Sequence, residues 1–251
     1  MSAATGKPRG KLISFEGGLS AGKTTQIKLL AKRLENAGYP VLVAHEQEDS
    51  VGAKAIGHLL SSGAASSFGN DMEAILAAAK IGDHVEQVIK PALDSGINVL
   101  CESYCDAFQV NQGIIRDADE KIIKALCHVT FEDAWPDLTL ILDIFPEEGM
   151  RRSNQNRKNG FAGAANKVDI VMQKARHAGY HKIAREAADR CDVIDASLRQ
   201  SYVAEKVWDA IARRDIFVDT SSTGKTVVAN NSNKTVVADL TNKTIVLGAS
   251  K

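Results

Sequence analysis

The sequence predicts a doubly wound α/β fold, a five-stranded parallel sheet with helices on both faces. Short apolar runs alternate with helical patterns over about the first 200 of the 251 residues. The runs are almost continuously hydrophobic, which is typical of parallel strands that are covered on both faces. A glycine-rich turn joins the first run to the first helical segment. This length is sufficient for one such domain and a small appendage.

Five apolar runs are the expected strands, and two helical patterns between them are clear. Residues 24–37 form a predicted helix that ends at Gly38. Between residues 72 and 92, apolar side chains recur at spacings of three and four, as one buried helical face requires. We expect right-handed crossovers between the strands. The expected strands are residues 11–16, 41–46, 98–102, 138–144 and 192–196.

Charge and hydropathy exclude several classes of protein. The 31 Lys and Arg residues balance 31 Asp and Glu residues, so neither a nucleic acid nor an anionic membrane is an expected partner. No apolar run approaches the ~20 residues that span a bilayer. Residues 1–10 lack the apolar segment of a signal peptide and are expected to be flexible. The cysteines have no zinc-ligand spacing, which favours buried thiols in a reducing, cytoplasmic protein: Cys101, Cys105, Cys127 and Cys191.

The C-terminal segment, residues 215–251, has a different pattern. Residues 225–229, 234–238 and 243–247 repeat a β-branched unit with a period of nine, and polar turn-forming residues separate the units. Three such strands predict a small β-meander, which is too small to be stable alone. We expect it to pack on the main domain, residues 11–214, or to pair between subunits. The alternative is a poorly ordered tail.

A phosphate-binding motif follows the first expected strand and opens the first helix. The sequence GGLSAGKT matches G-x-x-x-x-G-K-[ST], in the context that makes the pattern specific. Lys23 is expected to bridge the β- and γ-phosphates of ATP, and the Thr24 hydroxyl to bind Mg²⁺. The alternative is a glycine-rich turn that binds nothing. The expected nucleotide-binding residues are Gly17, Gly18, Leu19, Ser20, Ala21, Gly22, Lys23, Thr24 and Thr25.

Several further segments of the sequence match a known family in both order and spacing. Each is a weak signal alone, but together they are specific: residues 15–26, 84–93, 98–113, 136–143 and 195–197. Over roughly residues 10–213 the chain resembles the thymidylate kinase family of P-loop nucleoside monophosphate kinases. The resemblance implies a five-stranded parallel sheet, a mobile lid, a homodimer, and transfer of the γ-phosphoryl group of Mg·ATP to dTMP.

The residues expected to bind the phosphoryl donor agree with the family. Glu102 ends the third strand with a carboxylate, which can hold Mg²⁺ together with Thr24. Arg152 aligns with a family arginine at the start of the lid, here about residues 150–167, and Arg157 follows in the same basic cluster. These arginines would neutralise the transferring phosphoryl group. The expected catalytic residues are therefore Lys23, Glu102, Arg152 and Arg157.

The residues expected to bind the phosphoryl acceptor depart from the family. At three positions where the family has an arginine near the acceptor phosphate, this chain has His45, Ile81 and Ser103. The loss of three arginines must weaken the binding of an acceptor phosphate. Asp106 is either a ligand of the substrate sugar or a helix N-cap. In addition, Ala77 stands where the family has a base-stacking phenylalanine. Leu19 stands where the family has an acidic residue in the phosphate-binding loop. The candidate acceptor-binding residues are Glu46, Lys80, Phe108, Gln112 and Arg116, with His84 as a further cation.

Three hypotheses for function follow. The leading one is ATP-dependent phosphorylation of dTMP, or of a related or modified deoxynucleoside monophosphate. The second is a deoxynucleoside kinase in which Glu46 is the general base for a 5′-hydroxyl; the apolar Leu19 fits it, but Ser103 does not. The third is a catalytically silent nucleotide-binding subunit that assembles through its C-terminal tail.

Overall fold

The computed structural model confirms the predicted fold class. It describes residues 8–44, 51–158, 169–217, 227–231, 234–239 and 244–249. The main sheet has the order β2-β3-β1-β4-β5, and every neighbouring pair of strands is parallel. All five predicted strands are present: β1 (Leu12–Gly17), β2 (Val41–Ala44), β3 (Asn98–Glu102), β4 (Leu138–Asp143) and β5 (Cys191–Asp195).

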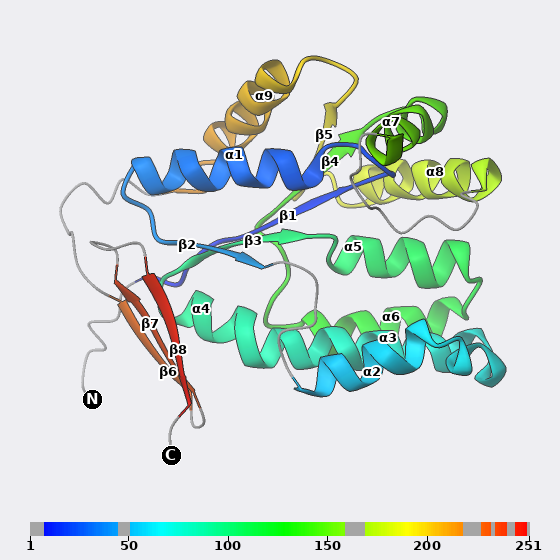
Figure 1. Ribbon diagram of the computed structural model, residues 1–251, viewed down its shortest axis with the longest axis horizontal. Helices are drawn as coiled ribbons and strands as arrows, with labels where there is room; N and C mark the ends of the chain where they lie inside the picture. The colour runs from blue at the N-terminus through cyan, green and yellow to red at the C-terminus, as the bar shows by residue number, and fades with distance from the viewer. Residues whose placement is uncertain are drawn as a thin grey trace.

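Helices cover both faces of this sheet (Figure 1). Helices α1 and α9 lie on one face, and α3, α4 and α6 lie on the other. A π-helical segment, Val85–Ile89, joins α3 to α4, and a second, Gln109–Ile115, continues α5. The helices are α1 (Lys23–Asn36), α2 (Val51–Ser61), α3 (Asn70–His84), α4 (Lys90–Asp94), α5 (Cys105–Phe108), α6 (Glu120–Phe131), α7 (Pro146–Lys158), α8 (Ile170–Glu186) and α9 (Gln200–Arg213), with a 3₁₀ turn at Ala64–Phe68.

The core lies in two layers because successive side chains of a strand point to opposite faces. In β1, Leu12 packs in the layer beneath α3, α4 and α6, whereas Ile13 packs in the layer beneath α1 and α9. Both side chains are fully buried, as the continuous apolar runs predict. All four cysteines are buried free thiols, in agreement with their expected structural role.

Three repeat units of the C-terminal segment form a separate antiparallel sheet with the order β6-β7-β8. Its strands are β6 (Val227–Asn231), β7 (Lys234–Asp239) and β8 (Thr244–Ala249). The predicted β-meander is therefore present in the structure. Within the described residues, no helix is both long enough and apolar enough to cross a membrane.

Because the five strands of the main sheet are parallel, their carboxyl ends meet at one edge. Gly17 ends β1, Glu102 ends the neighbouring β3, and Asp143 ends β4 on the other side. In open α/β sheets, ligands bind in the crevice outside this edge.

Candidate functional site

The glycine-rich loop between β1 and α1 has the backbone of an anion-binding turn. Gly17, Ser20 and Gly22 have φ angles of 133°, 52° and 99°. A Cβ atom on Gly17 would lie 2.4 Å from the carbonyl oxygen of Leu142 in β4, so only glycine fits there. Among the residues that the structure describes, no side chain caps the amino end of α1. Its first N–H groups therefore remain available for phosphate oxygens.

Lys23 folds back over this loop from the first turn of α1. Its ammonium donates hydrogen bonds to the carbonyl oxygens of Gly17 and Gly18, at 3.2 and 3.1 Å. Burial lowers the pKa of Lys23, while the carboxylates of Glu102 and Glu16 act in the opposite direction. The lysine therefore lies where a cation can contact a phosphate chain held by the loop.

Thr24 and Glu102, the two predicted magnesium ligands, are in direct contact. The Thr24 hydroxyl lies 2.8 Å from Oε2 and 3.1 Å from Oε1 of Glu102. The contact forms because β1 and β3 are neighbours in the sheet, with Phe15 opposite Glu102. Hydroxyl and carboxylate oxygens are the hard donors that Mg²⁺ prefers, so this pair fits the ion. Thr25 follows on the same exposed turn.

Glu16 is a buried acid behind the loop that accepts several hydrogen bonds, and it was not among the residues predicted from the sequence. Its Oε1 accepts hydrogen bonds from the Ser14 hydroxyl and the Tyr104 N–H, both at 2.7 Å, and the Tyr180 hydroxyl lies 3.3 Å from Oε2. Burial, followed by the negative charge of Asp106, raises the pKa of the Glu16 carboxyl to about 7. An acid inside an apolar strand just before the glycine loop was the available signal.

Asp106 is neither a sugar ligand nor an N-cap, so both interpretations were wrong. Its carboxylate is fully buried and pairs with Arg190 through two hydrogen bonds, of 2.7 and 2.8 Å. The Thr139 hydroxyl donates a third, at 2.9 Å. The amino end of α5 has no side-chain cap within the described part of the chain. The pair instead joins α5 to β4 and to the turn before β5.

Arg152 contacts the loop that follows β5. Its guanidinium donates to the carbonyl oxygens of Ala196 and Ser197, at 3.0 and 3.2 Å, and to Glu148 at 2.9 Å. The predicted lid arginine is thereby held beside the 195–197 block. Arg157 lies in the last turn of α7, and its side chain falls outside the described part of the chain, as do residues 159–167 of the predicted lid.

Arg176 on α8 is a further cation near the loop that the sequence analysis did not single out. Its guanidinium donates to Oδ1 of Asn111 at 3.1 and 3.3 Å. Its charge also acts on Lys23, whose pKa it helps to lower after burial. A basic helix after the lid was the only signal, and such helices are common on protein surfaces.

The four predicted acceptor-binding residues that lie within the described part of the chain have different surroundings. Phe108 is 3% exposed and packs edge-on against Phe131, so its burial does not support base stacking. Arg116 is paired with the buried Glu73 at 2.7 Å. Gln112 has a buried Oε1 that accepts no hydrogen bond within the described residues. Lys80 is half-buried on α3.

At two of the three positions where the family has arginines, the structure shows an uncharged side chain. Ile81 is buried in the core, and Ser103 has a left-handed backbone with φ of 58°, its N–H donating to the carbonyl oxygen of Phe15 at 3.0 Å. Neither presents a cation. Glu46 and His45 lie outside the described residues.

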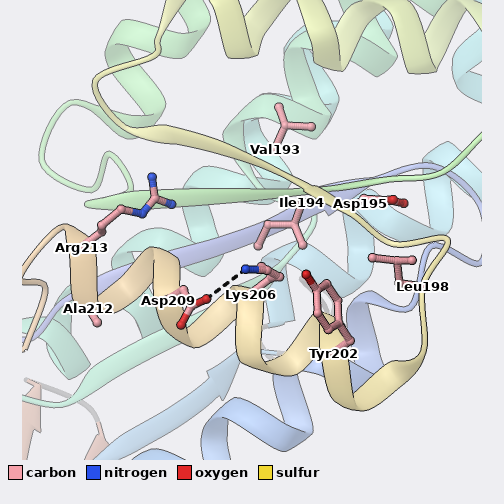
Figure 2. A pocket seen from close by; sticks show the side chains of 9 residues that line it. All are labelled: Val193, Ile194, Asp195, Leu198, Tyr202, Lys206, Asp209, Ala212 and Arg213. Carbon is pink, nitrogen blue, oxygen red and sulfur yellow. Dashed lines mark hydrogen bonds and ion pairs between the residues drawn. The ribbon is translucent and has the colours of Figure 1, made fainter.

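A cavity of about 670 Å³ lies away from the glycine loop, between β5 and α9 (Figure 2). Lys206 and Asp209 form a 3.3 Å ion pair on its α9 wall. No residue of the glycine loop lines it. The candidate site is therefore defined by backbone geometry at the sheet edge and not by this cavity. The lining residues are Val193, Ile194, Asp195, Leu198, Tyr202, Lys206, Asp209, Ala212 and Arg213.

Comparison with known proteins agrees with this geometry. Residues 15–207 match the family model described as "Thymidylate kinase". The thymidylate kinase of Afipia carboxidovorans is 40% identical over 206 residues, covering 82% of this chain and 90% of that protein. That of Nitrobacter winogradskyi is 40% identical over 225 residues, covering 88% and 98%. The chain therefore belongs to the thymidylate kinase family, a family of ATP-dependent nucleoside monophosphate kinases.

Proposed function

We propose that this protein transfers the γ-phosphoryl group of Mg·ATP to dTMP, giving ADP and dTDP. The observation that carries the proposal is the contact between Thr24 and Glu102 beside an intact phosphate-binding loop, in a chain of this family. The relatives named thymidylate kinase are similar to the chain over more than four-fifths of its length. This similarity does not favour the deoxynucleoside kinase or the silent-subunit hypothesis.

On the donor side, the loop N–H groups and Lys23 bind the phosphate chain of ATP. Thr24 and Glu102 would hold Mg²⁺, because their oxygens are hard donors that already lie side by side. When bound, Mg²⁺ supplies positive charge against the phosphate oxygens. Residues 17–25 therefore act as the nucleotide-binding loop as a whole.

Arginines of the lid and of α8 complete the cationic surroundings. Arg152 and Arg157 neutralise charge on the transferring group, and Arg176 adds a cation close to Lys23. No general base is required, because the phosphate of a nucleoside monophosphate is already an anionic nucleophile. Orientation and charge neutralisation are the means of catalysis in this proposal.

On the acceptor side, Gln112 is the strongest candidate for contact with the base. Its Oε1 is a buried acceptor without a partner among the described residues, and leaving such a group unpaired costs about 1–3 kcal/mol. An N–H group of a bound base would satisfy it. Lys80 and Glu46 remain candidates for the acceptor phosphate and sugar. The missing arginines favour a related or modified monophosphate as an additional acceptor.

The assembly is a homodimer of kinase domains, residues 11–214, with the tail, residues 215–251, as an additional contact between subunits. A three-stranded sheet of this size is marginal on its own. β6 contacts α4 of its own chain, and the proposed contact with the partner subunit would add to this support. Deletion of residues 218–251, followed by measurement of the mass in solution, tests it. An unchanged oligomeric state would contradict a role of the tail in assembly.

The function is tested by measuring ADP release from Mg·ATP across a panel of nucleosides and nucleoside monophosphates. Strong turnover with dTMP supports the proposal, and stronger turnover with a modified monophosphate would identify the additional acceptor. Lys23→Ala is the control, because it removes the cation over the loop. Turnover with nucleosides alone, or none above the control, would overturn the proposal.

A further inference from the structure

Three side chains outside the magnesium site converge at the end of β4. Oδ1 of Asp143 lies 2.7 Å from Nε2 of His177 and 3.1 Å from Nε2 of His181. The two imidazole rings are tilted against each other, with centroids 4.6 Å apart. One ligand atom from each residue lies within 4.8 Å of those of the other two. None of these residues takes part in the proposed phosphoryl transfer.

The fold holds these groups in place from two elements. His177 and His181 lie one turn apart on α8, so their side chains share a helical face. That face meets the carboxyl end of β4, where the Asp143 carbonyl oxygen accepts a hydrogen bond from the Ala196 N–H at 2.7 Å. The ring of Phe145 stacks on His177, with centroids 6.1 Å apart. The buried Tyr180, between the two histidines, anchors α8 to the core.

The donor set identifies the class of ion. Two imidazole nitrogens and one carboxylate oxygen are typical ligands of Zn²⁺ and similar borderline transition ions, whereas Mg²⁺ and Ca²⁺ favour oxygen ligands alone. We propose that Asp143, His177 and His181 form a Zn²⁺ site with three protein ligands and a fourth position open to water. The side chains are 28–33% exposed, so an ion can reach them from solvent.

Binding requires side-chain adjustments. Ligand atoms around a tetrahedral Zn²⁺ with bonds of ~2.0 Å are about 3.3 Å apart, so the 2.7 Å contact between Asp143 and His177 must widen. Any pair of these ligand atoms that is farther apart, up to the 4.8 Å limit of the cluster, must close toward the same separation. Each Nε2 must present its lone pair to the ion, which places the proton of the neutral imidazole on Nδ1. Two hydrogen bonds to Asp143 are then exchanged for metal–ligand bonds.

Bound Zn²⁺ cross-links α8 to the main sheet. The same helix carries Arg176, one residue before His177, so the site fixes the segment that places this cation near the phosphate-binding loop. The buried cysteines do not compete for the ion, because burial raises the pKa of the Cys101 and Cys105 thiols and opposes the thiolate that metal binding needs.

Calorimetric titration of untagged, chelator-treated protein with ZnCl₂ tests the proposal, without nucleotide and with excess MgCl₂ present. We expect one Zn²⁺ per chain and a rise in Tm on saturation. His181→Gln keeps a hydrogen-bond donor for Asp143 but removes a ligand, so it should weaken Zn²⁺ binding by about 100-fold or more. His128→Gln is the matched control, since His128 is an exposed histidine on α6.

A second probe does not depend on the variants. Co²⁺ added to the wild-type protein should produce the visible absorption of a four- or five-coordinate ion, and excess Zn²⁺ should abolish it. The proposal is overturned if wild-type protein binds no Zn²⁺ saturably. It is also overturned if His181→Gln and His128→Gln bind as tightly as the wild type, since the three residues would then form a hydrogen-bonded cluster alone. His177→Gln provides the same comparison if His181→Gln fails to fold.

Discussion

The Thr24 hydroxyl lies 2.8 Å from Oε2 of Glu102, which joins the first turn of α1 to the end of β3. The two residues are 78 positions apart in the chain, and the parallel pairing of β1 with β3 brings them together. Lys23 lies in the same turn of α1 and folds over the loop carbonyl groups. The first turn of α1 and the end of β3 therefore bring an ammonium, a hydroxyl and a carboxylate together beside the glycine-rich loop.

Glu102→Gln should lower kcat by roughly 100-fold and raise the Mg²⁺ concentration needed for half-maximal rate. The amide keeps a hydrogen-bonding partner for Thr24 but loses the negative charge that favours the ion. Initial rates measured against MgCl₂, at saturating ATP and dTMP, provide the check. Glu132→Gln, at an exposed position after α6, serves as the control. A wild-type Mg²⁺ dependence in Glu102→Gln would contradict the assignment.

Glu16→Gln should change how stability depends on pH. The pKa of Glu16 is about 7 in the folded protein against an ordinary 4.5, so between these values the carboxyl takes up a proton on folding. This contribution is complete below about pH 4.5 and is lost as pH rises through about 7, with a slope of at most ~1.4 kcal/mol per pH unit.

Urea unfolding between about pH 5 and about pH 8 measures this effect, as the difference between wild type and variant. The free energy of unfolding of the wild type should fall with rising pH relative to Glu16→Gln. Glu205→Gln, at an exposed acid on α9, should retain the wild-type slope. Parallel curves for wild type and Glu16→Gln would show that the carboxyl titrates at its ordinary pKa.

Asp106→Ala should lower the free energy of unfolding by about 3–5 kcal/mol, because it leaves the Arg190 guanidinium with no counter-charge in a largely buried position. The matched control is Asp209→Ala, which breaks the exposed pair with Lys206 and should cost less than about 1 kcal/mol. Chemical denaturation compares the two. Equal losses would mean that the Asp106–Arg190 pair contributes no more than a surface pair.

Gly17→Ala should destabilise the protein by ~1–3 kcal/mol or more, since the new Cβ would meet the Leu142 carbonyl oxygen at a φ of 133°. Gly18→Ala is its neighbour and control, because a Cβ there would meet no atom of the described residues within 4 Å. Thermal unfolding without nucleotide separates stability from phosphate binding. Similar Tm values for the two variants would refute the steric argument.

Local patterns in the sequence were sufficient to predict the glycine-rich loop and to single out Glu102 at the end of its strand. The glycine-rich motif specified the loop geometry, because its conformation depends on consecutive residues that include Gly17 and Gly22. Glu102 was identified because a charged residue at the end of an apolar run marks the carboxyl edge of a parallel sheet. The contact of Glu102 with Thr24 depends on the pairing of β1 with β3, which the tertiary structure shows.

Other contacts could not be predicted from sequence, because they depend on how the elements pack. In the sequence, Asp106 has the position of an exposed residue at the start of a helix. Its partner Arg190 is 84 residues away, and the two meet only when α5 and the turn before β5 pack against β4. From the sequence, Phe108 is a candidate for stacking on the base of the acceptor, but in the folded protein it packs against Phe131.

The sequence by itself determined the α/β fold, the phosphate-binding loop and the family, because these depend on hydrophobic periodicity and on a contiguous motif. The tertiary structure alone decided the burial of Glu16, the Asp106–Arg190 pair and the convergence of His177 and His181 on Asp143. The physical reason is that a charge or a ligand acquires its chemistry from its neighbours. Those neighbours are determined by packing between elements that are far apart in the sequence, so a local sequence pattern does not predict them.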